Sequence, residues 1–191
     1  MIIRKLLAGL ARAGTELGAP WVLVILVAVP AGFLAHRPWW GVALALAASV
    51  LPQSLIIARR GFGDRHARGV DRRFEYAVTI LPVLAYCATA AACRQGAMAL
   101  LAAVMMLTLV LAGAVTGIFR WKVSVHAAVA AGAVLIWWAL GLDARAVVLA
   151  LLLPAWIGWS RVRVRDHTAG QVWAGAACGV AAGLVFAVCA S

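Results

Sequence analysis

Long apolar runs separated by short polar gaps dominate the pattern of this chain. A helix that crosses a lipid bilayer needs about 20 apolar residues, with a range of roughly 17 to 25. Seven runs come near that length. They cover residues 20–36, 39–57, 76–93, 97–119, 125–141, 145–159 and 168–189. The pattern therefore predicts an all-α, polytopic membrane helical bundle of about seven transmembrane helices.

Two of the prolines in these runs affect the prediction. The sixth run is short and contains Pro154, so a bundle of six transmembrane helices is the alternative. Pro52 lies inside the second run and predicts a bend there, because proline lacks the amide hydrogen of a regular helix. In the last run, Gly175, Gly179 and Gly183 recur at four-residue spacing. Small residues on one face of a membrane helix predict close packing against a neighbouring helix.

Residues 1–19 precede the first run and mix leucines with basic residues. Arginine breaks their apolar stretch, and no small-residue cleavage site follows a long apolar core, so a secretory signal is excluded. We expect a short amphipathic helix at the membrane surface. The whole chain, 1–191, is then a single membrane domain that begins with this interfacial segment.

Composition and charge support a membrane location. Hydrophobic residues make up 66% of the chain, its mean hydropathy is +1.01, and its net charge is +11. In a soluble protein this charge would suggest nucleic acid. Here the basic residues fall in the gaps between apolar runs, which favours membrane lipids and lipid phosphates as partners and no nucleic acid.

The basic residues are distributed unequally between the two sides of a seven-helix bundle. Fourteen of the 17 fall on the side of the N-terminus, in segments 1–19, 58–75, 120–124 and 160–167. Cytoplasmic loops carry the excess of lysine and arginine. This distribution predicts a multi-pass protein of the cell (inner or plasma) membrane, with its N-terminus in the cytoplasm and its C-terminus outside.

Three of the four histidines, His66, His126 and His167, lie on that same basic side. Cleavage of a phosphate ester needs cations to neutralise the phosphoryl group, a nucleophile, and an acid for the leaving oxygen. Arginine binds phosphoryl oxygens through paired hydrogen bonds. Neutral histidine can attack phosphorus, and a second histidine can donate the proton near neutral pH. The residues of this side therefore suit phosphoryl transfer, and we expect the functional site there.

The same residues resemble the phosphatidic acid phosphatase type 2 family, whose motifs read K-x6-R-P, P-S-G-H and S-R-x5-H-x3-D. Ser160, Arg161 and His167 match the third motif at its spacing. Ser124 and His126 match the second motif. Arg73 matches the arginine of the first motif, with His66 at its lysine position. The motifs occur in the family's order, and the resemblance covers roughly residues 60–185 as a phosphatase-like core.

The resemblance implies a role for each matching residue. His167 would be the nucleophile, and His126 the general acid. Arg73, Arg161 and His66 would bind the phosphoryl oxygens, together with the Ser124 hydroxyl and the backbone N–H of Val125. Gln171, at the position of the family's aspartate, would orient His167. No metal and no cofactor is implied.

This chain departs from the motifs at several positions, which are Phe74, Val123, Val125 and Gln171. A glutamine carbonyl can accept a ring N–H, but it cannot stabilise an imidazolium as a carboxylate does. Asp166 is next to His167, yet adjacent side chains on a helix diverge, so Asp166 is not expected to replace the missing carboxylate.

Three functions fit these features. The first is an integral membrane lipid phosphatase that acts without metal on a polyprenyl (di)phosphate or a related lipid phosphate monoester, through a phosphohistidine intermediate. The second is a catalytically weak protein that binds lipid phosphates in the same pocket. The third, a transporter or channel for a small anion, is disfavoured because the apolar runs contain almost no polar residues.

Overall fold

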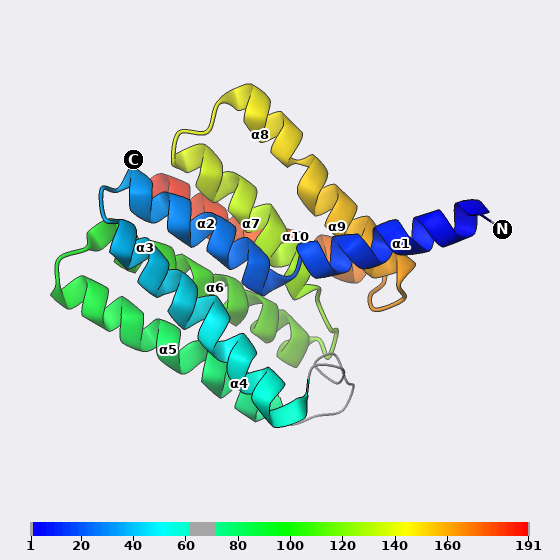
Figure 1. Cartoon of the computed structure of the whole chain (residues 1–191), viewed down its shortest axis with the longest axis horizontal. Coiled ribbons are helices and arrows are strands. Elements are labelled where there is room, and N and C mark those ends of the chain that lie inside the picture. Colours follow the sequence, from blue (N-terminus) through cyan, green and yellow to red (C-terminus); the bar gives the residue numbers. More distant parts are fainter. Residues whose placement is uncertain (1, 62–71, 191) are drawn as a thin grey trace. The chain divides into compact units, whose positions relative to one another are not determined.

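The computed structural model describes residues 2–61 and 72–190 (Figure 1). The side chains of Ile2, Arg60, Arg72, Arg73 and Tyr76 are outside that description. Helices make up 86% of the structure, and the described residues contain no strand. The elements are α1 (Ile2–Leu17), α2 (Pro20–Leu34), α3 (Pro38–Ala45), η1 (Leu46–Val50), α4 (Leu51–Arg60), α5 (Arg72–Ala92), α6 (Gly96–Ile118), α7 (Val125–Ala139), α8 (Ala144–Ala150), α9 (Leu152–Arg163) and α10 (Ala169–Ala190). The predicted all-α class is confirmed.

Four of the described helical segments are long and apolar enough to cross a membrane. They are Pro38–Arg59, Gly96–Ile118, Ala144–Arg163 and Ala169–Ala190. A fifth arises if α1 and α2, which meet at a bend of 51°, form one broken span. The apolar parts of α5 and α7, Ala77–Ala92 and Val125–Ala139, are shorter. All seven predicted runs are therefore helical in a membrane protein, but the count of seven spans is not confirmed.

Large apolar side chains cover the outer faces of these helices. Val148 is 65% exposed, Leu149 is 67% exposed and Val188 is 74% exposed. Water would make such surfaces costly, whereas lipid tails are as apolar as the side chains themselves. The interior instead contains many alanines and glycines, which let helices approach closely.

Both prolines of the sequence prediction distort their helices. The π-helical turn η1 directly precedes α4, in which Pro52 is the second residue. Proline at that position cannot donate to the carbonyl four residues earlier, so the turn widens to i→i+5 hydrogen bonding. Near Pro154 the helical segment divides at Leu151 into α8 and α9. Pro52 thus follows a π-helical turn within one segment, Pro38–Arg59, and the predicted bend stays a prediction.

The chain forms two compact units. One unit is Val24–Met106, and the other combines Met1–Leu23 with Leu107–Ser191. In the first unit, the Tyr86 hydroxyl donates to the backbone carbonyl of Trp40 at 2.8 Å, and the two rings meet edge to face. The second unit, which we call the C-terminal unit, holds the matched residues of the second and third motifs.

Glycines set the spacing between α7 and α10 in the C-terminal unit. A Cβ atom on Gly175 would collide with the carbonyl of Ser124, and one on Gly179 would collide with the carbonyl of Ala128. A Cβ atom on Gly183 would come within 2.8 Å of Leu135. The predicted glycine stripe therefore packs directly on the backbone of α7, which confirms it as a packing surface.

Helix α1 packs on α9 in a similar way. A Cβ atom on Gly14 would collide with the hydroxyl of Ser160, and one on Gly18 would collide with Ile157. Ile157 belongs to a buried apolar cluster with Leu23 and Ala130. The predicted N-terminal helix is therefore confirmed and is attached to the helix that carries Ser160 and Arg161. Its location at the membrane surface stays a prediction.

We expect Gly179→Ala to destabilise the protein, because the new methyl group forces α10 away from the backbone of α7. The matched control is Gly113→Ala in α6, where no atom lies within 4 Å of the added Cβ. There the substitution should stabilise the helix by up to about 1 kcal/mol through helix propensity. Thermal unfolding in detergent would measure both. Equal midpoints for the two variants would contradict the close packing of α7 and α10.

Candidate functional site

A Schellman turn ends α9 and arranges the residues of the third motif. The Asp166 N–H donates to the carbonyl of Arg161 at 3.1 Å, and the Arg165 N–H donates to the carbonyl of Val162 at 3.0 Å. Arg165 has φ +60°, a left-handed conformation that glycine usually adopts. The chain thereby reverses, and the His167 N–H also reaches the carbonyl of Arg161, at 3.3 Å.

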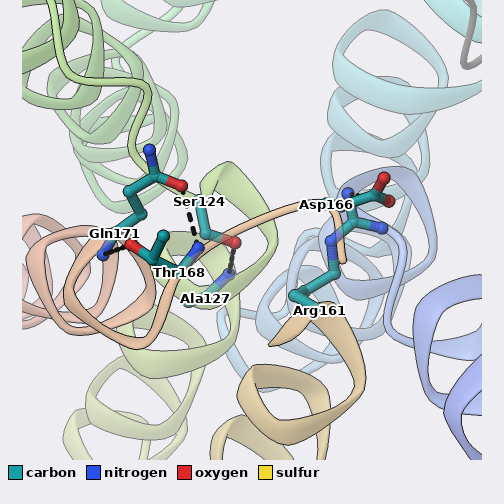
Figure 2. A network of polar contacts seen from close by, with 6 residues as sticks. All are labelled: Ser124, Ala127, Arg161, Asp166, Thr168 and Gln171. Carbon is teal, nitrogen blue, oxygen red and sulfur yellow. Dashed lines mark hydrogen bonds and ion pairs between the residues drawn. The ribbon is translucent and has the colours of Figure 1, made fainter. Parts of the chain in front are cut away.

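Arg161 is buried at this turn and forms an ion pair with Asp166. Its Nη2 lies 2.8 Å from Oδ2 of Asp166, and its side chain is only 7% exposed (Figure 2). Its Nε is buried and has no hydrogen-bond partner within the described part of the chain. Asp166 thus neutralises Arg161, as expected from a buried charge that needs a partner. The Asp166 carboxylate pairs with the arginine of the motif.

A capping box begins α10. Oε1 of Gln171 accepts from the Thr168 N–H at 3.0 Å, and the Gln171 N–H donates to the Thr168 hydroxyl at 3.3 Å (Figure 2). This reciprocal pair is the T-x-x-Q form of the motif. His167 precedes the cap residue, so it lies in the turn before the helix. Gln171 therefore stabilises the start of α10 and also lies near His167.

Ser124 joins the beginning of α7 to the beginning of α10. Its backbone N–H donates to the carbonyl of Gln171 at 3.1 Å, and its hydroxyl accepts from the Ala127 N–H at 3.4 Å as the N-cap of α7. Ser124 is fully buried. Because the hydroxyl accepts in this cap, its own proton remains available for donation. The matched serine of the second motif thus lies beside the third motif.

Val125 and His126 are the first two residues of α7. The amide of a first helical residue has no partner inside its own helix, and its N–H points outward from the N-terminal end. The positive end of the helix dipole lies at the same place. The ring atom Nε2 of His126 is buried. An anion at this end of α7 would therefore meet an amide donor and a titratable side chain.

His167 is 8% exposed, and its Nδ1 has no hydrogen-bond partner among the described residues. Burial lowers the pKa of His167, and the charges of Arg161 and Lys122 lower it further. Hydrogen-bonding groups of Lys122 and Gln171 act in the opposite direction on the same pKa, but less strongly. The imidazole is therefore neutral near pH 7, with a lone pair available on its ring.

The structure does not describe the side chains of two of the predicted site residues. His66 lies outside the described residues. Arg73 belongs to α5 in the other compact unit, and its side chain is outside the description. The first motif therefore stays a prediction. The structure brings together Ser124, Val125, His126, Arg161, His167 and Gln171 within the C-terminal unit.

The structure adds residues that sequence reasoning did not identify. Lys122 lies close enough to His167 to influence its charge state, although 45 positions separate them in the chain. Thr168 caps α10, and its T-x-x-Q spacing was readable in the sequence. No local sequence pattern predicts that Lys122 lies near His167, because this proximity arises from the packing of α7 against α10.

No group of three or more histidine, cysteine, aspartate or glutamate side chains converges within the described part of the chain. Comparisons with family models, with curated proteins and with solved structures return no match. The resemblance to the phosphatidic acid phosphatase type 2 family therefore rests on the motif residues alone.

We expect His167 to titrate below the usual histidine value of about 6.5. Arg161→Gln should raise the pKa of His167, because it removes the largest charge effect, while burial still keeps that pKa below the usual value. NMR titration of labelled histidines in detergent would measure both midpoints. Arg163→Gln is the matched control, because this exposed arginine is not among the groups that shift His167. A wild-type midpoint above 6.5 would contradict the buried, cation-flanked environment.

Proposed function

We propose that this protein is an integral membrane lipid phosphatase that hydrolyses a polyprenyl (di)phosphate, or a related lipid phosphate monoester, through a phosphohistidine intermediate. One observation carries the proposal. Arg161 Nε and His167 Nδ1 are both buried without a hydrogen-bond partner among the described residues, at the end of a membrane-spanning segment. A buried polar group without a partner costs about 1–3 kcal/mol. A phosphoryl group bound here would accept from the guanidinium and lie beside the imidazole.

The neighbouring groups suit each step of this reaction. A ring nitrogen of neutral His167 attacks phosphorus, while the bond from phosphorus to the leaving oxygen breaks. Protonated His126 donates its proton to that oxygen. Arg161, the Ser124 hydroxyl and the Val125 amide stabilise the negative charge on the phosphoryl oxygens. Water then attacks the phosphohistidine and gives a proton back to His126, which releases phosphate and restores His167.

The hydrogen bond between Ser124 and Gln171 supports a membrane crossing by α7. It holds the starts of α7 and α10 together, so both starts lie at the same membrane face. The chain must therefore cross the membrane an even number of times between the start of α7 and the start of α10. Two crossings meet this condition, one by α7 and one by α8 together with α9. The excess of basic residues then favours a cytoplasmic site and an external C-terminus. The substrate would accordingly be a lipid phosphate present in the cytoplasmic leaflet.

Phosphate release tests the activity. We expect the purified protein in detergent micelles, without added metal, to release phosphate from at least one member of a panel of polyprenyl monophosphates, polyprenyl diphosphates, phosphatidic acid and phosphatidylglycerol phosphate. His167→Asn should reduce this release at least about 1,000-fold, because the nucleophile is lost. His36→Asn is the matched control and should retain full activity, since His36 is exposed and outside the site. Equal activity of the two variants would exclude His167 as the nucleophile.

Reporter fusions test the arrangement in the membrane. With seven spans, a reporter inserted at Gln95 and one fused to the C-terminus should both be external. If α5 and α7 did not cross, the reporter at Gln95 would be cytoplasmic while the C-terminal one stayed external. An internal C-terminus would contradict the cytoplasmic location of the site.

A binding protein for lipid phosphates is the second candidate, and two observations favour it. Asp166 already occupies one edge of the Arg161 guanidinium. The Gln171 carbonyl accepts from Thr168, and a carboxylate that could stabilise an imidazolium is missing from position 171. A wild-type protein that binds lipid phosphates and releases no phosphate would favour this function over catalysis.

A further inference from the structure

A cleft in the C-terminal unit lies between α1 and the end of α9. Its volume is about 570 Å³, and its lining includes Arg12, Thr15 and Glu16 from α1, and Arg163 and Asp166 from the end of α9 and the following turn. The lining contains none of the residues that would contact the phosphoryl group, although Asp166 pairs with Arg161 of that site. The cleft is therefore a separate feature, and its occupant does not depend on the proposed phosphatase activity.

The charges in the cleft leave two arginines available. Asp166 pairs with Arg161 at 2.8 Å, and Glu16 is electrostatically coupled to the same guanidinium. Together with Arg161, the lining has three arginines and two carboxylates, which leaves one positive charge in excess. Arg12 and Arg163 are exposed, and within the described part of the chain neither forms an ion pair or a side-chain hydrogen bond. The cleft consequently offers two unpaired guanidinium groups to an anion.

Thr15 adds a buried donor to these two cations. Its side chain is only 9% exposed, and its hydroxyl has no hydrogen-bond partner among the described residues. A threonine inside a helix commonly donates to the carbonyl three or four residues earlier, but Thr15 does not. Its hydroxyl proton is therefore available in the wall of the cleft. Two guanidinium forks and a hydroxyl are the donors that bind phosphate oxygens.

The surroundings of the cleft indicate where such a phosphate comes from. Arg163 ends a membrane-spanning segment, so the cleft lies at the boundary between lipid tails and headgroups. Ile3, Leu6, Leu10 and Leu17 are exposed on one stripe of α1 at helical spacing. Such an apolar stripe beside basic residues is typical of helices that lie in the membrane surface. The stripe lies on the face of α1 opposite the cleft lining, so α1 contacts lipid on one face while the cleft, on the other face, lies at the level of the headgroup phosphates.

We propose that the cleft between α1 and α9 binds the phosphate of an anionic phospholipid headgroup and thereby anchors α1 at the membrane surface. Native mass spectrometry of the full-length protein in neutral detergent would measure binding of phosphatidylglycerol and of phosphatidylcholine. We expect the wild-type protein to bind phosphatidylglycerol at least about 10-fold more tightly. The double variant Arg12→Gln/Arg163→Gln should lose this preference, because it removes both guanidinium groups from the cleft.

The matched control is Arg4→Gln/Arg165→Gln, which removes the same charge from α1 and from the same turn but outside the cleft lining. It should keep the preference within about three-fold. An equal loss in both double variants would overturn the proposal in favour of diffuse attraction between charges. Thr15→Val should weaken binding while Thr15→Ser retains it, and neither should unfold the protein. Equal affinity of the Val and Ser variants for phosphatidylglycerol would contradict a hydrogen bond from Thr15 to the phosphate.

Inorganic phosphate distinguishes the two sources of the anion. Ten millimolar phosphate, a concentration of the order used for weak anion sites, should not displace phosphatidylglycerol, because the acyl chains contribute to binding. Displacement at that concentration would mean that the cleft binds a soluble anion and would overturn the lipid assignment. Because Arg12, Arg163 and Thr15 lie outside the phosphoryl site, an inactive enzyme would leave this result unchanged.

Discussion

The hydrogen bond from the Ser124 N–H to the Gln171 carbonyl is the contact on which the candidate site depends. It requires the backbones of α7 and α10 to touch, and Gly175 and Gly179 make this possible because a side chain at either position would collide with α7. Lipid provides no hydrophobic driving force between helices, so close packing and polar contacts must hold the pair together. The starts of both helices, with their free amides and positive dipole ends, consequently lie side by side.

Arginine burial imposes the second constraint. Removing a guanidinium from water is costly, and separating a buried ion pair typically costs 3–5 kcal/mol. Asp166 provides the countercharge for Arg161, and the left-handed conformation of Arg165 turns the chain so that this contact forms. In the proposed reaction, a phosphoryl group binds the same guanidinium, so phosphate and Asp166 share one cation. The balance between these two anions would then set how tightly substrate is held.

The sequence predicted the helices well, because lipid permits a lone segment to cross only as a helix with its backbone hydrogen bonds satisfied internally. The glycine stripe from Gly175 to Gly183 and an irregularity near Pro52 were also predictable, since both have direct steric causes. The turn that contains His167 was not predicted. A glycine at the left-handed position would have predicted the helix end, but Arg165 occupies it. The sequence around this turn therefore did not predict the pairing of Arg161 with Asp166.

The roles of individual polar residues were predictable only in part. The T-x-x-Q spacing of Thr168 and Gln171 is visible in the sequence and predicts a capping box. The resemblance to a catalytic motif instead implied that Gln171 orients His167. The influence of Lys122 on His167 arises from tertiary packing across 45 positions, and no pattern in the sequence indicates it. Tertiary contacts of this kind decide whether matched motif residues meet.

Chemical trapping of the intermediate tests the central claim most directly. The protein would be mixed with a lipid phosphate labelled in its terminal phosphoryl group, quenched with alkali within one turnover, and mapped by mass spectrometry under conditions that preserve phosphohistidine. The account predicts label on the peptide that contains His167 and on no other histidine. Substrate turnover without label at His167, or label at a different residue, would contradict the assignment of this turn as the phosphoryl-transfer site.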